Sequence, residues 1–182
     1  LIKGQNEVFP ELDFTPNLCL AFGERNFLSN SSCVSSLRKK YPNAIISGCS
    51  TSGEILGEKV TDNTVAITAI KFDKTQLEVE EVSLKNTNHS SKEAGLTLAK
   101  SLNNEGLKHV LVFSDGLNVN GTELVNGMQE GLPKDVTVTG GLAGDGPNFE
   151  QTFIIGNDGK LHDYKISARG FYGNNIEIGF SS

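Results

Sequence analysis

Short apolar runs alternate with amphipathic segments in the first part of the chain. Residues 17–22 and 44–48 are apolar runs, and the segment 31–41 between them carries its apolar side chains at helical spacing before Pro42. This pattern predicts a strand, a helix and a second strand. Two strands joined by a crossover helix pair in parallel, and the crossover is right-handed.

The same pattern returns in the middle of the chain. Segment 91–102 predicts a helix with an apolar stripe, while 110–113 and 136–139 predict strands. Asn120 is the expected N-cap of a second helix in this region, over 121–130. Strands and helices that alternate in this way are typical of an α/β arrangement.

A hairpin is expected between these two regions. Residues 64–72 alternate between two faces, and 77–84 follows after a polar turn, so we expect the two runs to pair, with a bulge near Glu80 and Glu81. Together with Glu78, these carboxylates predict that the second run is an exposed sheet edge, because charged side chains oppose edge-to-edge pairing.

The pattern changes to strands alone after Phe149. Residues 152–155, 161–168 and 176–180 predict strands, and the pair Asp158-Gly159 is a strong hairpin signal. The predicted fold class is therefore mixed α/β (α+β). A strand-helix-strand N-terminal half is followed by an antiparallel β-meander, in one mixed sheet or two packed sheets with about three helices outside.

Length and composition limit the possible classes of protein. The chain has 182 residues, which fits a single domain over 1–182, and 37% hydrophobic with 21% charged residues is typical of a globular protein. Its apolar runs are too short to cross a bilayer. A net charge of -6 argues against nucleic acid and anionic membranes as partners.

The cysteines indicate a reducing compartment. Cys19, Cys33 and Cys49 are odd in number and lack the spacing of a disulfide framework or a zinc site, so we expect free thiols, no metal and a cytoplasmic location. The chain begins at Leu1 and its single methionine is Met128, so we expect a piece of a longer protein.

Three glycine-rich segments carry the candidate chemistry. They cover 48–54, 113–121 and 140–146, and each follows a predicted strand. Glycine allows tight turns and close backbone approach, while the Ser, Thr, Asn and Asp residues between the glycines supply donors and acceptors. Ligands of open α/β sheets bind at the carboxyl ends of the strands, so the three loops predict a small polar cup.

The first segment predicts an anion site. Between Gly48 and Gly53 lie four small residues, Cys49, Ser50, Thr51 and Ser52. Backbone N–H groups in such a loop can surround a carboxylate. The alternative is a tight turn whose hydroxyls bond to their own backbone. The segment has neither the phosphate-binding P-loop ending nor a dinucleotide fingerprint, so a nucleotide ligand is not expected.

Two aspartates in the other segments are candidates for the cationic end of a ligand. Asp115 and Asp145 each precede a glycine, and either carboxylate could accept an ammonium group or only fasten its own turn. Asn118 and Gly141 complete the predicted ligand-binding set, and Glu54 is a further candidate acceptor. With the anion site, such a carboxylate would recognise both ends of a free amino acid.

These motifs, in this order, resemble a known family. Residues 48–55 behind 41–46, then Phe113-Ser114-Asp115-Gly116, then 140–146, are similar to the FIST N-terminal domain, named for F-box and intracellular signal transduction proteins. The resemblance covers the chain from about Leu18 to Ser182 and is weaker over 1–16.

The resemblance implies a bacterial sensory domain that binds small ligands such as amino acids or small carboxylates and is not an enzyme. It also implies a C-terminal companion domain and a signalling effector such as a histidine kinase. No cofactor is expected, although some members of the family look like haem-binding nitric oxide sensors.

Three alternatives remain from the residues themselves. Haem needs an axial ligand, for which the histidines are His89, His109 and His162. A hydrolase would use Cys49 or Ser50 as its nucleophile, but the pattern Gly-x-Ser-x-Gly is not met. A partner-binding module without a ligand would have no pocket where the loops meet.

Overall fold

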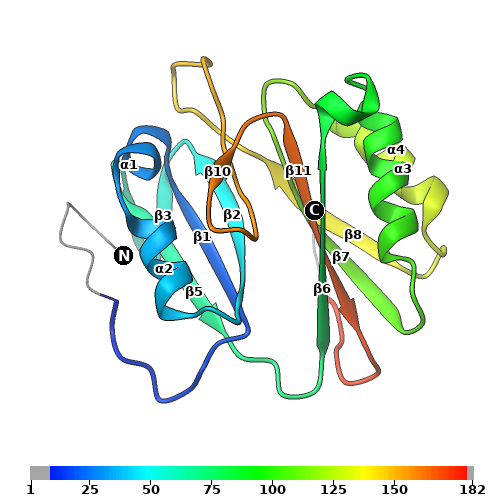
Figure 1. Ribbon diagram of the computed structural model, residues 1–182, viewed down its shortest axis with the longest axis horizontal. Coiled ribbons are helices and arrows are strands. Elements are labelled where there is room, and N and C mark those ends of the chain that lie inside the picture. The colour runs from blue at the N-terminus through cyan, green and yellow to red at the C-terminus, as the bar shows by residue number, and fades with distance from the viewer. Residues whose placement is uncertain (1–8, 180–182) are drawn as a thin grey trace. The chain divides into compact units, whose positions relative to one another are not determined.

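The structure is a computed structural model that describes residues 9–179, and its chain folds into two compact units (Figure 1). The first unit contains the described residues up to Lys71, with Asp115–Leu117 and Ala143–Asp163. The second unit contains Phe72–Ser114, Asn118–Leu142 and the described residues from Tyr164 onward. The expectation of a single domain stays a prediction.

The first unit is built on the predicted strand-helix-strand motif. Strand β1 (Leu18–Glu24) pairs in parallel with β2 (Ile45–Thr51), which confirms the expected parallel pairing. The connection holds two helices rather than one, α1 (Arg25–Asn30) and α2 (Cys33–Lys40). The short α1 was missed because its six residues carry too few apolar positions to show a helical period.

Three more strands extend this sheet to the order β10-β9-β2-β1-β5. Strand β5 (Val65–Ile70) runs antiparallel to β1, and β9 (Ile154–Ile155) and β10 (Leu161–His162) form the hairpin that Asp158-Gly159 predicted. A separate two-stranded hairpin consists of β3 (Glu54–Leu56) and β4 (Lys59–Thr61).

Helices α1 and α2 cover one face of this sheet (Figure 1). The core between them is a cluster of buried apolar side chains: Cys19, Ala21, Leu28, Cys33, Val34, Leu37, Ala44, Ile46, Val65 and Ile155. Two of the three cysteines are therefore core side chains, and all three are buried free thiols.

The second unit has a four-stranded sheet in the order β6-β11-β7-β8. Strand β11 (Lys165–Tyr172) runs antiparallel to its neighbours β6 (Gln76–Ser83) and β7 (Leu107–Ser114). Strand β8 (Thr137–Leu142) is parallel to β7 and forms one edge of the sheet.

One face of this second sheet is covered by α3 (Ser91–Leu102) and α4 (Gly121–Gly131) (Figure 1). The Asn120 side chain caps α4 as predicted, accepting from the Glu123 N–H at 3.1 Å. The helices pack closely because α4 presents Gly127 to α3, where a Cβ would overlap the carbonyl oxygen of Lys92. A short 3₁₀ helix, η1 (Leu84–Thr87), precedes α3.

Three details of the strand prediction are wrong, although the mixed α+β class is confirmed. The run 64–72 does not pair with 77–84, because β5 joins the first sheet and β6 pairs with β11. The β6–β11 register continues through Glu80 and Glu81 without a bulge. The described part of 176–180, residues 176–179, forms no strand, and Phe180 lies outside the described residues.

The carboxylates of β6 lie on an edge strand, as predicted, but they are half-buried. Glu81 accepts hydrogen bonds from Lys165 Nζ at 2.9 Å and Ser167 Oγ at 2.7 Å on the neighbouring strand. Within residues 9–179, no helix has the length and apolar character needed to span a membrane.

Candidate functional site

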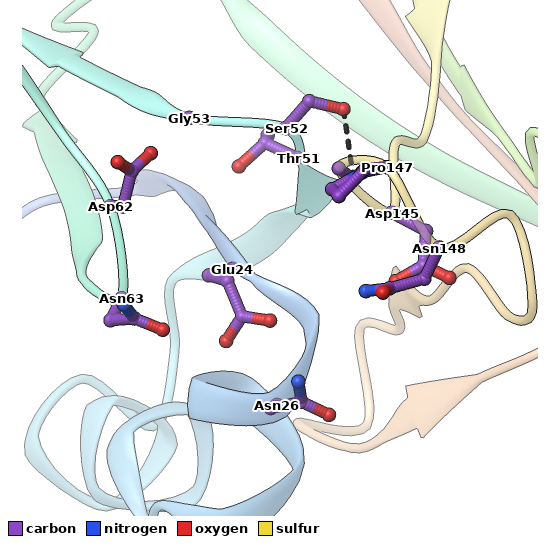
Figure 2. Close-up of a pocket in the computed structure, with 11 residues that line it drawn as sticks. Glu24, Asn26, Thr51, Ser52, Gly53, Asp62, Asn63, Asp145, Pro147 and Asn148 are labelled. Atoms are coloured by element: carbon purple, nitrogen blue, oxygen red, sulfur yellow. Dashed lines mark hydrogen bonds between the residues drawn. The ribbon is translucent and has the colours of Figure 1, made fainter.

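The first unit contains a polar hollow with a volume of about 270 Å³ (Figure 2). Four separate segments of the chain form its walls: 24–26, 51–53, 62–63 and 145–148. The residues that line it are Glu24, Asn26, Thr51, Ser52, Gly53, Asp62, Asn63, Asp145, Gly146, Pro147 and Asn148. We refer to this cavity as the polar hollow.

Two of these walls follow from the parallel pairing of β1 with β2. Glu24, the last residue of β1, is in register with Thr51, the last residue of β2. Parallel strands bring their carboxyl ends to the same edge of a sheet, which is where ligands of α/β proteins bind. The polar hollow therefore lies at the edge where this rule places ligands, but of the three predicted loops the segment 113–121 contributes no residue to its lining.

A network of hydrogen bonds through Ser50 joins the third glycine segment to the end of β2. The Ser50 hydroxyl donates to the Gly144 carbonyl at 2.8 Å and accepts from the Phe153 N–H at 2.9 Å. The Gly144 N–H donates to the Ser50 carbonyl, also at 2.8 Å. Ser52 Oγ then accepts from the Gly146 N–H at 3.1 Å. These contacts fix the wall 145–148 against the wall 51–53.

Asp145 holds its own loop from inside the wall. One carboxylate oxygen, Oδ2, accepts from the backbone N–H groups of Glu150 at 2.8 Å and Gln151 at 3.0 Å. The other, Oδ1, lies 2.8 Å from Arg25 Nε, and the Arg25 guanidinium also reaches Glu150 at 3.3 Å. Burial acts to raise the pKa of Asp145, but these hydrogen bonds and Arg25 outweigh it, so the pKa lies below its usual value.

Glu54 lies beneath the walls 51–53 and 62–63 and holds them together. Its side chain is buried and accepts hydrogen bonds from Thr51 Oγ1 at 2.6 Å and Thr64 Oγ1 at 2.8 Å. Glu54 was a candidate acceptor for a ligand, but it does not line the polar hollow. Its carboxylate instead ties the start of the β3–β4 hairpin to β2 and to the turn before β5.

The polar hollow is rich in acceptors. Figure 2 shows Glu24 near its middle, with Asp62 and Asn63 on one side and Asp145 and Asn148 on the other. None of the described lining residues is Lys, Arg or His. Since Arg25 pairs with Asp145 behind the wall, Glu24 and Asp62 supply the negative charge that faces the cavity, and the asparagine amides supply donors.

The predicted site residues of the first segment separate into two groups. Thr51 and Ser52 line the polar hollow, whereas Gly48, Cys49 and Ser50 are buried within strand β2. The segment is thus a strand up to Thr51 and not a loop from Gly48 onward. The strand ladder and the Ser50 contacts engage the backbone of residues 48–51.

The other predicted residues divide in the same way. Asp145 lines the polar hollow, whereas Asp115 is buried and fastens its own turn by accepting from the Leu117 N–H at 2.9 Å. Asn118 and Gly141 belong to the second unit and do not line the polar hollow.

Six residues that line the polar hollow lie outside the three glycine segments of the sequence prediction: Glu24, Asn26, Asp62, Asn63, Pro147 and Asn148. A signal for some of them exists in the chain. Asp62-Asn63 is a turn-forming pair directly before a strand, and Asn63 adopts a positive φ of 52°. Such pairs at strand ends would have been reasonable additional candidates.

The side chains that haem or hydrolase chemistry would use have defined surroundings in the structure. Both ring nitrogens of His109 hydrogen-bond with threonine hydroxyls, Nδ1 with Thr137 at 2.7 Å and Nε2 with Thr139 at 2.9 Å. His162 Nε2 lies 3.0 Å from the Asp158 carboxylate. Burial raises the pKa of the Cys49 thiol to about 12, which keeps it protonated and poorly nucleophilic. Among the described residues, no three His, Cys, Asp or Glu side chains gather in a way that could hold a metal ion.

Comparison with known proteins identifies the family. No curated protein matches the chain. The family model of the FIST N domain matches residues 17–182, which is nearly the whole chain and includes every wall of the polar hollow. The chain therefore belongs to the FIST N domain family, a family of sensory domains in signal transduction proteins.

Proposed function

We propose that the polar hollow is the ligand site of this sensory domain and that it binds a small molecule with an ammonium group, such as a free amino acid. The observation that carries the proposal is the chemistry of the lining. Carboxylates and amides face a cavity of about 270 Å³, and no cationic side chain is among the described lining residues. A bare carboxylate ligand would meet like charge there, so an amino acid is favoured over a small carboxylate.

Each end of an amino acid has a counterpart in this lining. The ammonium group would lie between Glu24 and Asp62, because charge-assisted hydrogen bonds are the stronger ones, worth roughly 1.5–3 kcal/mol each. The ligand carboxylate would accept from the side-chain amide of Asn26 and from the second N–H of Asn148, whose amide also bonds to Asp145. Asp145, already neutralised by Arg25, would fix the wall and not the ligand.

Signalling would follow from ordering of the walls. A ligand that bridges 51–53 and 145–148 favours the conformation in which both walls are in place, and a population shift of this kind can be read by a neighbouring domain. The proposal includes a C-terminal companion domain and an effector such as a histidine kinase as the readers, in a bacterial cytoplasm. It includes no catalytic step.

Thermal shift and calorimetry with three classes of compound test the proposal. The first class is amino acids, the second is the amines that lack the carboxylate, and the third is the acids that lack the amine. We expect stabilisation by at least one amino acid, weaker stabilisation by its amine and none by its acid, because a ligand of the folded state raises stability by mass action.

Matched aspartate variants locate the site. Asp62→Asn removes one charge from the lining and should weaken binding by about tenfold, or 1.4 kcal/mol. Asp135→Asn makes the same change at an exposed position of the second unit and should leave binding unchanged. Equal affinity in both variants, or stabilisation by the acids alone, would overturn the proposal.

A further inference from the structure

A second cavity lies within the second unit, between α4 and the parallel strands β7 and β8. Its volume is about 470 Å³, and ligand pockets usually have about 300–1,000 Å³. The residues that line it are Val112, Ser114, Gly121, Leu124, Val125, Val138, Thr139, Gly140, Gly141 and Leu142. We refer to it as the apolar cavity. It reaches the carboxyl ends of two parallel strands, where α/β proteins bind ligands.

Ser114, the last residue of β7, is a buried polar residue in this lining. It is 1% exposed and lies on the face that α4 covers, since Val110 and Val112 of the same strand belong to the core under that helix. The Ser114 hydroxyl makes no hydrogen bond to any residue within 9–179. Buried polar groups in folded proteins are nearly always hydrogen-bonded, so this hydroxyl at a cavity wall points to a ligand atom as its partner.

The beginning of α4 supplies a second donor to the apolar cavity. The first N–H groups of a helix have no partner within the helix. The Asn120 side chain accepts from the Glu123 N–H at 3.1 Å, but the Gly121 N–H has no partner in the described part of the chain. Ser114 and Gly121 can therefore both donate to an oxygen of one ligand.

The remaining lining suits an apolar and uncharged body. The side chains of Leu124, Val125, Val138 and Leu142 face the cavity, and Leu142 is 51% exposed. The Thr139 hydroxyl bonds instead to His109 at 2.9 Å. None of the described lining residues carries a charge. A carboxylate would lose its hydration here without gaining a cation as partner, and Glu123 in the first turn of α4 opposes an anion at this helix end.

We propose that the apolar cavity is a second binding site, for an uncharged small molecule with an apolar chain and a carbonyl oxygen at one end. The carbonyl oxygen accepts from the Ser114 hydroxyl and the Gly121 N–H, and the chain covers Leu142 and Val125. This site differs from the polar hollow in its unit and in the chemistry of its ligand. The domain would thus respond to two classes of compound.

NMR titration of the backbone amides tests the site with three probes that share one chain length. Hexanamide is uncharged and has a carbonyl oxygen, hexanoate is an anion, and hexylamine is a cation. Hexanamide should shift the amide signals of Gly121, Gly140 and Gly141 in a saturable way. Hexanoate at neutral pH should bind at least about tenfold more weakly, because its charge must be desolvated, and hexylamine should not bind.

Two serine variants separate binding from stability. Ser114→Ala should weaken hexanamide about tenfold yet leave the melting temperature of the free protein unchanged or higher, because its hydroxyl has no hydrogen bond to lose. Ser167→Ala is the matched control on β11. Its hydroxyl donates to Glu81 at 2.7 Å and accepts from Arg169 at 2.6 Å, on the face away from α4. This variant should lower the melting temperature and bind hexanamide normally.

The proposal fails if hexanamide gives no saturable shift at the three glycines, or if Ser114→Ala binds it as tightly as the unmodified chain does. Binding of hexanoate as tight as that of hexanamide would refute the uncharged class of ligand. A loss of stability in Ser114→Ala equal to that in Ser167→Ala would show that the hydroxyl has a structural partner, which also refutes the proposal. These outcomes are independent of amino acid binding in the polar hollow, which Asp62→Asn tests in the other unit.

Discussion

Replacing Asp145 with asparagine tests whether one buried carboxylate holds the wall of the polar hollow. The Asp145 side chain is 2% exposed and faces Arg25 Nε at 2.8 Å and the backbone N–H groups of Glu150 at 2.8 Å and Gln151 at 3.0 Å. The Asn148 side-chain amide also donates a hydrogen bond to it. Asparagine has nearly the same shape but only one acceptor oxygen. Whichever way its amide is turned, the NH₂ group faces a donor.

The cost of this change can be estimated from its contacts. Removing one partner of a buried ion pair costs roughly 3–5 kcal/mol, because the other charge is left without compensation. Arg25 keeps Glu150 at 3.3 Å, so we expect the lower end of that range, about 3 kcal/mol. At roughly 2–4 °C per kcal/mol for a chain of this size, the melting temperature should fall by about 6–12 °C. Glu150→Gln, at a side chain that is 70% exposed, should cost less than about 1 kcal/mol.

The pH dependence gives a second, independent check on Asp145. The pKa of Asp145 in the folded protein lies below the usual value of about 3.9. Its contribution to stability is therefore complete above the usual value and is lost as the pH falls through the lower pKa of the folded state. The stability gap between the unmodified chain and Asp145→Asn should therefore be full near neutral pH and shrink in acid below about pH 4.

Thermal unfolding followed by circular dichroism measures the gap, and amide hydrogen exchange at Glu150 and Gln151 reports the loop itself. Exchange at these two amides should speed up in Asp145→Asn and stay slow in Glu150→Gln, because only the first change replaces their charged acceptor with a neutral amide. If Asp145→Asn is no less stable than Glu150→Gln, or if the gap is the same in acid as at neutral pH, the carboxylate does not hold the wall.

Three further predictions concern the interior of the two units. Gly127→Ala places a methyl group against the Lys92 carbonyl and should lower the free energy of unfolding by roughly 1–3 kcal/mol. Asn126→Ala, at an exposed position of the same helix, should leave it unchanged. Equal melting temperatures of the two variants would contradict the close packing of α3 and α4. Ellman's reagent should leave Cys49 unmodified at mildly alkaline pH until the chain unfolds, since burial raises its pKa to about 12, and rapid reaction of the folded chain would refute its burial. Burial also lowers the pKa of His109, so its NMR titration should have a midpoint below about 6.5 and stability should fall as the pH drops through that value; a midpoint at or above it would show that the ring is solvated.

Local signals were sufficient for the elements that depend on neighbours in sequence. The N-cap at Asn120, the helix over 91–102 and the turn at Asp158-Gly159 all form as predicted, because caps, helical periods and tight turns are decided within a few residues. The pairing of 77–84 was wrong because its partner, Lys165–Tyr172, lies far along the chain. Alternation along a strand identifies the strand but not its neighbour.

The lining of the polar hollow was predictable to a similar extent. Thr51, Ser52 and Asp145 were expected in one pocket, and all three line the polar hollow. Glu24 and Asn26 were not expected, since Glu24 reaches the cavity only through the register of β1 against β2, and α1 was not expected at all. Register depends on the packing of whole strands, so no short motif contains it.

The glycines themselves have a different role from the one their spacing suggested. A Cβ at Gly48 would overlap the carbonyl oxygen of Ala21 on β1, and a Cβ at Gly140 would overlap that of Val112 on β7. Both glycines have φ near +150°, at 147° and 154°, and both sit opposite those residues in a parallel strand pair. Gly116 meets the Ala143 carbonyl in the same way.

Each glycine segment thus contains a glycine that allows close approach of two backbones. The polar side chains that line the cavity come from other positions. This separation decides how the site must be mapped. Substitution of Gly48 would disturb the β1–β2 pair and remove ligand binding without any contact to the ligand. Asp62 lines the cavity and is exposed, so a loss of binding in Asp62→Asn would point to the proposed ligand contact itself.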